Sequence, residues 1–135
     1  MHYWILKTEP SNYSFDQLVH DRATAWDGVK NPLALKYLRE MEPGDQVLIY
    51  HTGDERSVIG RAEVTSVAYP DPKTKDPKLV VVNLKAGERL PKPVTLAEIK
   101  ADHRFMDLGL VRQGRLSVVP ATEDQWKKLV EMGSK

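Results

Sequence analysis

The chain has 135 residues, 41% of them hydrophobic and 29% charged, a balance that is ordinary for one soluble globular domain. Cysteine is absent, which excludes disulfides, thiolate metal sites and thiol nucleophiles. The net charge of +1 lacks the basic excess that usually marks a nucleic-acid binder, so any contact with phosphates has to come from a local patch.

The first predicted element is a strand over HYWILKT (2–8), a segment rich in β-branched and aromatic residues. Ser14 follows, and Gln17 three residues later completes the pattern of a capping box, so a helix is expected over FDQLVHD. The stretch AWDGVKNP (25–32) continues no clear strand and starts no clear helix before its end. Its tryptophan is either a plug of the core or one wall of a binding site.

A second helix is predicted from Asn31, a good N-cap, and Pro32, which suits the first helical position. It has to stop before Pro43, because proline cannot continue a helix. Its buried stripe should consist of Ala34, Leu38 and Met41. Strand candidates follow at QVLIYHT (46–52) and VIGRAEVTSVAY (58–69), and their direct succession favours antiparallel pairing.

The segment YPDPKTKDPK (69–78) has three prolines and alternating charge, which predicts a long exposed turn. Further strands are predicted at LVVVNLK (79–85) and RLSVVP (115–120). Helices should start after Thr95 and Thr122, since each is followed by Glu or Gln at the capping-box spacing. Five strands with short helices between them favour an α+β domain built on a curved sheet or partly closed barrel.

Signatures of enzymes and metal sites are missing from the sequence. The eight glycines form no phosphate-binding loop, the four histidines lack metal-ligand spacing, and no serine lies in a nucleophile elbow. HTGDERS (51–57) mixes polar residues, but a turn between strands explains it without catalysis. We therefore expect no catalytic residues, no metal and no cofactor.

Neither a membrane span nor a secretory leader is visible, because no apolar run approaches the roughly 20 residues that cross a bilayer. No basic amphipathic helix suggests binding at a membrane surface. The expectation is a cytoplasmic, monomeric protein with a single domain over residues 1–135 and no membrane partner.

Aromatic and hydrogen-bonding residues gather instead at the predicted strand ends and bends, in WILKTEP, AWDGVKNP, IYHT and GRLSVVP. A curled sheet would bring these segments to one concave site with an aromatic platform, hydroxyls, an amide and a guanidinium. A nucleobase suits such a site, because bases stack on aromatic rings and are read by hydrogen bonds at their edges.

Four long segments resemble the EVE domain family: YWILKTEPSNYSFDQL, AWDGVKNPLALKYLREMEPGDQVLIYHTG, IGRAEVTSVAYPDP and LVRQGRLSVVPATEDQW. The resemblance covers nearly the whole chain and implies a PUA-like fold, a curved sheet or pseudo-barrel with flanking short helices. It also implies kinship with YTH domains, which read methylated adenine in RNA. By the same resemblance the chain is a non-enzymatic reader of modified bases, particularly modified cytosine in DNA, that flips the base into a pocket.

The resemblance implies a ligand-binding set drawn from four segments: Lys7, Glu9, Tyr13, Ser14, Trp26, Gly28, Val29, Asn31, Tyr50, His51, Arg115, Leu116 and Ser117. Contacts with phosphates are expected from Lys30, Lys36, Arg39, Arg112 and Arg115. Lys30 stands where the family usually has arginine, and the two are not equivalent at stacked or bidentate contacts. This departure leaves the choice of modified base open.

Several of these residues have rival structural roles. Ser14 and Asn31 are also N-caps, and a capping side chain cannot easily read a base. Tyr50 either lines the pocket or fills the barrel. Arg115 and Ser117 should share one face of their strand, while Trp4 and Trp126 should pack in the core.

Two other functions stay open. One is a reader of modified RNA. The other is an enzyme acting on modified nucleotides, in which Glu9 or Asp27 beside His51 would do the acid–base work.

Overall fold

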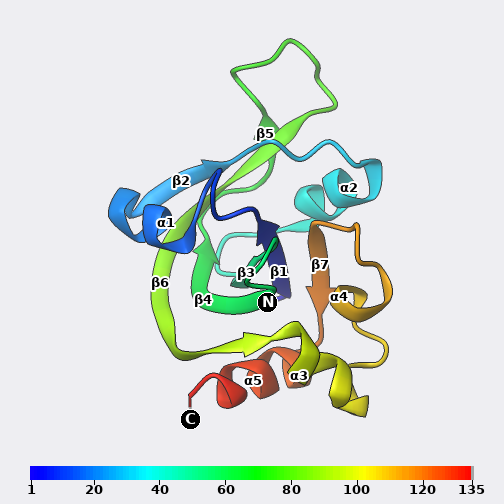
Figure 1. Ribbon diagram of the computed structural model, residues 1–135. Helices are drawn as coiled ribbons and strands as arrows, with labels where there is room; N and C mark the ends of the chain where they lie inside the picture. Colours follow the sequence, from blue (N-terminus) through cyan, green and yellow to red (C-terminus); the bar gives the residue numbers. More distant parts are fainter. Residues whose placement is uncertain (135) are drawn as a thin grey trace.

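A curved, unclosed sheet of seven strands forms the centre of the computed structural model, which describes residues 1–134 (Figure 1). The strands run in the order β2-β6-β4-β3-β1-β7, and β5 pairs with β6 outside this path. β1 and β3 are parallel, whereas every other pair is antiparallel. The strands are β1 (Tyr3–Thr8), β2 (Ala23–Trp26), β3 (Gln46–His51), β4 (Ser57–Val64), β5 (Tyr69–Pro70), β6 (Val80–Thr95) and β7 (Val118–Ala121).

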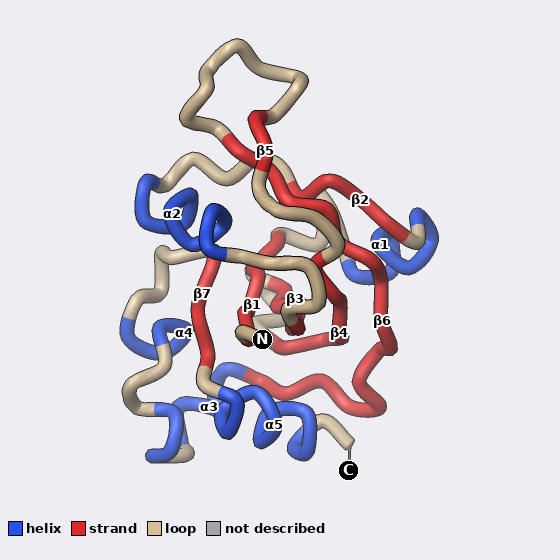
Figure 2. Tube along the Cα trace, turned by 180° about the vertical axis from the view of Figure 1, so that it is seen from behind, coloured by secondary structure: helices blue, strands red, loops and turns tan. Residues whose placement is uncertain are grey.

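Short helices flank the sheet at its edges and at one end. Helix α1 lies beside β2 and β6, α2 and α4 lie beside β7, and α3 and α5 pack against β6, as the front and rear views agree (Figures 1 and 2). Their bounds are α1 (Phe15–Asp21), α2 (Pro32–Glu40), α3 (Leu96–Ala101), a 3₁₀ turn η1 (His103–Phe105), α4 (Gly109–Arg112) and α5 (Glu123–Met132). The expected α+β architecture with flanking short helices is confirmed. No helix within residues 1–134 has the length and apolar character to cross a membrane.

The four predicted helix starts are confirmed, and their caps show why the sequence marked them so clearly. Thr95 and Thr122 each complete a capping box with the residue three positions on. Asn31 Oδ1 accepts from the backbone N–H groups of Leu33 and Ala34 at 2.9 and 3.1 Å. The box predicted at Ser14 is only half formed, because the side chain of Gln17 donates to Asp21 instead of reaching back.

The strands of the structure differ from the predicted ones in four places. The strand expected at 79–85 continues to Thr95 because β4 stays paired with it through two irregularities in register. The strand expected at 58–69 ends at Val64, where Ser66 accepts the backbone N–H of Asn83, and a separate short β5 follows.

The last predicted strand, 115–120, begins only at Val118, because a turn closes between Leu116 N–H and the Gln113 carbonyl. The stretch 25–32 starts with an unpredicted strand, β2. Its four residues are too few and too exposed to show the alternation of a buried strand.

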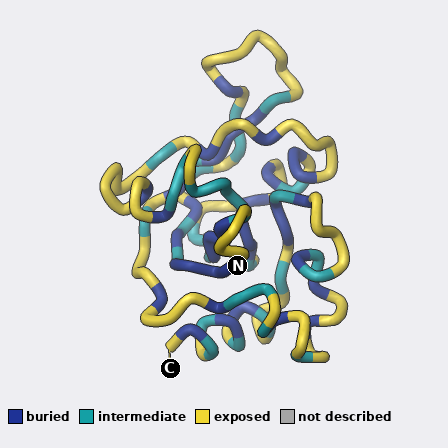
Figure 3. The backbone as a smooth tube through the Cα atoms, viewed as in Figure 1, coloured by how far each residue is buried: buried dark blue, intermediate teal, exposed yellow. Residues whose placement is uncertain are grey.

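The core fills the inside of the curved sheet, where the buried parts of β1, β3 and β4 gather (Figure 3). Trp4 and Trp126 are both buried, as expected, and so is the α2 stripe of Ala34, Leu38 and Met41. Asp45 is a buried carboxylate at the start of β3, and it accepts N–H groups of His2, Trp4 and Glu42 at 3.0 Å each. The chain between residues 72 and 78 is exposed and projects from the body as the predicted long turn (Figure 1).

Candidate functional site

A pocket of about 570 Å³, the main pocket, opens where the end of β1 faces β2 and the loop after it. Its size lies within the usual range for small-ligand sites, about 300–1,000 Å³. It is lined by Lys7, Thr8, Glu9, Asn12, Tyr13, Thr24, Ala25, Trp26, Asp27, Gly28, Val29, Lys73 and Ser117. Lys7 N–H at the end of β1 donates to the carbonyl of Ser117, in the loop before β7. This backbone hydrogen bond brings residues far apart in the sequence to one rim of the pocket.

Trp26 forms an aromatic wall of this pocket and also belongs to the core. It is the last residue of β2, pairs with Val82 of β6, and keeps only 7% of its surface exposed. The ring of Tyr13 meets it edge-on, with ring centres 6.0 Å apart and planes at 84°. Gly28 then turns the chain at φ +78°, a backbone conformation that glycine adopts without strain. The tryptophan is therefore both core plug and pocket wall.

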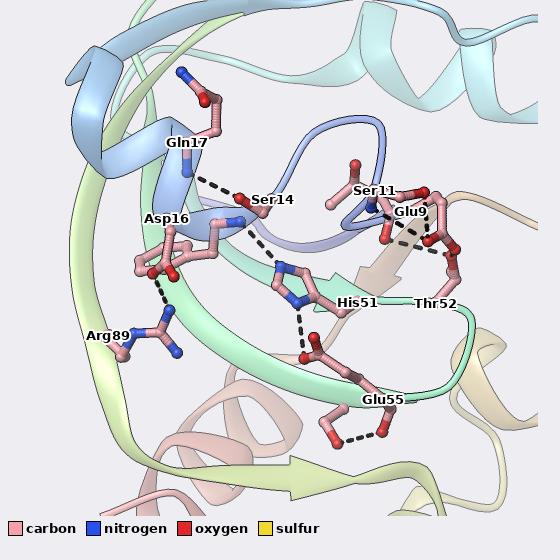
Figure 4. Close-up of polar contacts among 12 residues, drawn as sticks. Glu9, Ser11, Ser14, Asp16, Gln17, His51, Thr52, Glu55 and Arg89 are labelled. Carbon is pink, nitrogen blue, oxygen red and sulfur yellow. Dashed lines mark hydrogen bonds and ion pairs between the residues drawn. The ribbon is translucent and has the colours of Figure 1, made fainter.

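Glu9 supplies a fixed negative charge to the lining of the main pocket. Its carboxylate accepts the backbone N–H and the hydroxyl of Ser11 at 3.3 and 3.0 Å, and the Thr52 hydroxyl at 3.3 Å (Figure 4). These hydrogen bonds, the backbone one foremost, lower the pKa of Glu9. The carboxylate is therefore ionised at neutral pH and presents acceptors to a ligand amino group.

Gly53 packs directly behind Glu9. A Cβ at this position would lie 2.7 Å from Glu9 Oε2, and the backbone has φ +76°. We expect Gly53→Ala to displace the Glu9 carboxylate and to lower ligand affinity about 5-fold, with a stability loss of about 1 kcal/mol from the backbone strain. Titration of the pocket's ligand against Gly53→Ala and Gly44→Ala tests this, because Gly44 has a similar φ of +96° and lines neither pocket, and a Cβ there meets no atom within 4 Å. Equal losses in both variants would contradict the expectation.

Lys7 stands on the boundary between the main pocket and a smaller neighbour. Its Nζ donates to the Gly114 carbonyl at 2.9 Å and lies 5.9 Å from the centre of the Tyr50 ring. Burial lowers the pKa of Lys7, because desolvation disfavours the charged ammonium. Tyr50 itself is buried and lines only the smaller pocket.

His51 lies outside the main pocket, under the start of α1 (Figure 4). Its Nε2 accepts the backbone N–H of Phe15 at 2.9 Å, and its Nδ1 lies 3.0 Å from Glu55 Oε2. The tautomer with hydrogen on Nδ1 satisfies both contacts. His51 therefore anchors α1 and has no free ring nitrogen for a ligand.

The predicted ligand-binding residues thus divide into two groups. The main pocket brings together Lys7, Glu9, Tyr13, Trp26, Gly28, Val29 and Ser117. Ser14 and Asn31 instead cap α1 and α2. Asn31 also lines a separate hollow of about 290 Å³, together with Arg115 and the buried Leu116. Arg115 and Ser117 do not share a strand face as predicted, since the strand begins after them.

Residues that the sequence did not mark also line the main pocket. Thr8, Asn12, Thr24 and Ala25 adjoin predicted residues and follow from the same segments. Lys73 comes from the long turn and reaches Asp27 with an ion pair of 3.2 Å. Lys73 reaches the main pocket because β5 pairs with β6 and thereby positions this turn. No local sequence pattern predicts this placement.

The predicted phosphate contacts all lie outside the main pocket. Lys30 and Lys36 are exposed, on the loop before α2 and on α2 itself. Arg39 donates to the Lys78 carbonyl at 2.8 Å, and Arg112 pairs with Asp107 at 3.3 Å. Within residues 1–134 no cluster of three or more His, Asp or Glu side chains could hold a metal ion.

Comparison of the chain with known proteins identifies its family. The model of the EVE domain matches residues 2–132. The chain belongs to the EVE domain family. Human thymocyte nuclear protein 1 is 25% identical over 167 residues, covering 98% of this chain and 74% of that protein.

Solved EVE domain relatives share the whole fold. A protein of Rhodopseudomonas palustris, with an NMR structure, is 41% identical at a TM-score of 0.92, covering 98% of this chain and 93% of that one. The human THYN1 protein in complex with 5-methylcytosine-containing DNA is 25% identical at a TM-score of 0.90, covering 100% and 99% of the two chains. The family and the PUA-like fold expected from the sequence are confirmed.

Proposed function

We propose that this EVE domain is a non-enzymatic reader of modified cytosine in DNA, and that its main pocket receives the base after it leaves the stack. The observation that carries the proposal is that the main pocket combines an aromatic wall of Trp26 and Tyr13 with the ionised carboxylate of Glu9. Support comes from the human relative with the same fold, whose structure is a complex with 5-methylcytosine-containing DNA.

The chemistry of a cytosine fits this arrangement. Aromatic rings provide a surface on which the flipped base stacks, worth about 1–3 kcal/mol per base. The Glu9 carboxylate suits the exocyclic amino group of cytosine, which is a hydrogen-bond donor. Flipping itself costs a few kcal/mol, which stacking and edge contacts have to offset.

The contacts of His51 argue against the enzyme hypothesis, in which Glu9 or Asp27 beside His51 would do the acid–base work. Both ring nitrogens of His51 are engaged, by Phe15 and Glu55, and neither faces Glu9 or Asp27. Glu9 is held ionised by its own hydrogen bonds, which suits an acceptor rather than a proton donor. A reader of modified RNA uses the same pocket chemistry, so the polymer has to be decided by experiment.

The test is a titration with short labelled duplexes that differ in one central cytosine: plain, 5-methyl, 5-hydroxymethyl, 5-formyl or 5-carboxyl. We expect one modified duplex to bind at least about 10-fold more tightly than the plain one, in the range that a pocket for a small group provides. Equal affinity for all five duplexes would contradict the proposal. A 2-aminopurine beside the modified cytosine tests flipping, since unstacking raises its fluorescence, and matched RNA strands as competitors decide the polymer.

We further propose that the domain binds as a monomer. Its large exposed apolar side chains within residues 1–134 belong to separate segments: Met1, Val19, Leu33, Val67 and Met106. Sedimentation with and without DNA tests this. A cytoplasmic location was expected from the sequence, whereas the relatives are named as nuclear proteins, so imaging of the tagged protein has to decide the compartment.

A further inference from the structure

A second pocket of about 250 Å³ adjoins the main pocket and carries only positive charge. It is lined by Lys7, Tyr50, Thr52, Gly53, Arg56, Leu96, Lys100, Leu110, Val111 and Gly114. Three of these residues are cations and none is a carboxylate. We call it the cationic pocket.

The three cations have no acidic partner. Lys7 donates to the Gly114 carbonyl, and Arg56 Nε donates to the Gly53 carbonyl at 3.3 Å. The side chain of Lys100, on α3, forms no hydrogen bond or ion pair with any residue in the described chain 1–134. Lys92, which also lies near α3, is instead paired with Glu98 at 3.7 Å. The positive charge in the cationic pocket is therefore left for an external anion.

The floor of the cationic pocket strengthens the attraction. Tyr50 and Leu110 are buried at its base, and Val111 and Leu96 are half-buried beside them. Apolar walls exclude water and lower the local dielectric, so each cation acts on a bound anion more strongly than on an open surface. The Thr52 hydroxyl also lines this pocket, but its single proton is donated to Glu9, so the cations alone are left to attract an anion.

The two pockets are connected through shared residues. Lys7 lines both of them, and Thr52 of the cationic pocket donates to Glu9 of the main pocket. In a nucleotide the base and its phosphate are joined by a single sugar, so a base in the main pocket would carry a phosphate to this neighbouring position.

We propose that the cationic pocket binds a phosphate group, and that in the DNA complex this is the backbone phosphate beside the base held in the main pocket. The second clause rests on the proposed function, while the first stands without it. The same chemistry would accept free phosphate, so the experiment separates the two sources. The residues in contact with phosphate would be Lys7, Arg56 and Lys100.

The first measurement compares wild type with Arg56→Gln, Lys100→Gln and the double variant on plain and modified duplexes at several salt concentrations. Each single change is expected to weaken binding to both duplexes by about 5-fold and to reduce the slope of log affinity against log salt by about 1. Lys85→Gln is the matched control. Lys85 pairs with Glu63 near the end of β4, whereas Arg56 immediately precedes the start of that strand. It should leave affinity and slope unchanged, and thermal melting checks that every variant is folded.

The second measurement places one neutral methylphosphonate linkage at each position around the modified cytosine. One position next to that base should cost the wild type about 5-fold or more and cost the double variant clearly less, because Lys7 alone of the three cations remains to contact that phosphate. Inorganic phosphate, added during recording of amide spectra, reports binding of the free anion at Gly53, Thr52 and Lys100.

The outcomes separate the two proposals. If Arg56→Gln and Lys100→Gln bind both duplexes as wild type does, with the same salt slope and no response to phosphate, the cationic pocket is not an anion site. A response to inorganic phosphate without any sensitive linkage would overturn the backbone assignment. If plain and modified duplexes bind equally while both variants still lose affinity, the reader proposal fails and the anion site stands.

Discussion

Trp26→Leu is expected to lower affinity for a duplex with the preferred modified cytosine by about 5- to 150-fold, the range that corresponds to about 1–3 kcal/mol for stacking one base on an aromatic ring. Leucine keeps much of the buried volume of Trp26, which is 7% exposed, but offers no flat surface to a base. Affinity for the plain duplex should change by less than about 3-fold, because phosphate contacts supply most of it. Anisotropy of a labelled duplex measures both values.

Trp126→Leu is the matched control for this experiment. Trp126 is 5% exposed, packs under Arg61 with the guanidinium 4.9 Å from its ring centre, and lines no part of the main pocket. Its indole N–H has no hydrogen-bond partner within residues 1–134, so its replacement removes packing and the contact with Arg61 but no hydrogen bond. If both variants lose the same factor in affinity, general destabilisation explains the loss and Trp26 is not a wall of a base-binding site.

The candidate site could be predicted most readily where neighbouring residues in the sequence share one environment. Trp26, Gly28 and Val29 follow one another around a turn, so a single motif placed all three correctly at the main pocket. Tyr50 and His51 are also neighbours, but they lie in a strand, where successive side chains point to opposite faces. Because of this alternation, Tyr50 faces the cationic pocket and His51 faces the backbone of α1.

Residues with two possible roles could not be assigned from the sequence. The oxygens of Ser14 and Asn31 are occupied by backbone N–H groups at the helix starts, as the rival structural interpretation of each had it. The resemblance assigns Arg115 to the ligand, and the strand alternation expected to place it beside Ser117 is removed by the turn between Gln113 and Leu116. In each case the decisive fact is a hydrogen bond of the backbone, which side-chain type alone does not reveal.

The elements of the fold also differ in whether local sequence or contacts with distant segments determine them. Helix starts depend on four consecutive residues, so Thr95 and Thr122 announced α3 and α5 correctly. The length of β6 depends on its partner β4, which continues through register shifts around Gly60. The exposed, charged stretch of β6 after Leu84 has no strand-like alternation. Pairing with β4 keeps it extended, together with backbone hydrogen bonds from Ala86 to Arg22 and from Lys92 to Gly133.

Gly60→Ala is expected to destabilise the protein by about 3 kcal/mol, because overpacking a rigid core typically costs 1–3 kcal/mol and here the clash is severe. A Cβ at Gly60 would lie 2.3 Å from Cζ of the Phe15 ring, which is fully buried. The ring cannot easily move away, since the Phe15 backbone N–H is bound to His51 and the Arg89 guanidinium lies 5.6 Å from its centre. Urea denaturation monitored by circular dichroism measures the loss.

A double-mutant cycle tests whether the Phe15 ring is the cause. Phe15→Leu shortens the side chain, so Gly60→Ala should cost at least about 1 kcal/mol less in that background than in the wild type. Additive losses would mean that the clash lies elsewhere. Gly114→Ala, at a glycine with no neighbour within 4 Å of its Cβ, should stay within about 0.5 kcal/mol of the wild type.

The same contact should connect stability with binding. Phe15 is the first residue of α1, and the chain just before it contributes Asn12 and Tyr13 to the main pocket. A displaced Phe15 ring would move this segment and with it the edge of Tyr13 that meets Trp26. Gly60→Ala is therefore expected to weaken binding of the modified duplex even under conditions where the variant is folded. Gly44 lines neither pocket and Gly44→Ala retains the α1 contact, so a loss confined to Gly60→Ala would show that the position of α1 sets the shape of the base-binding wall.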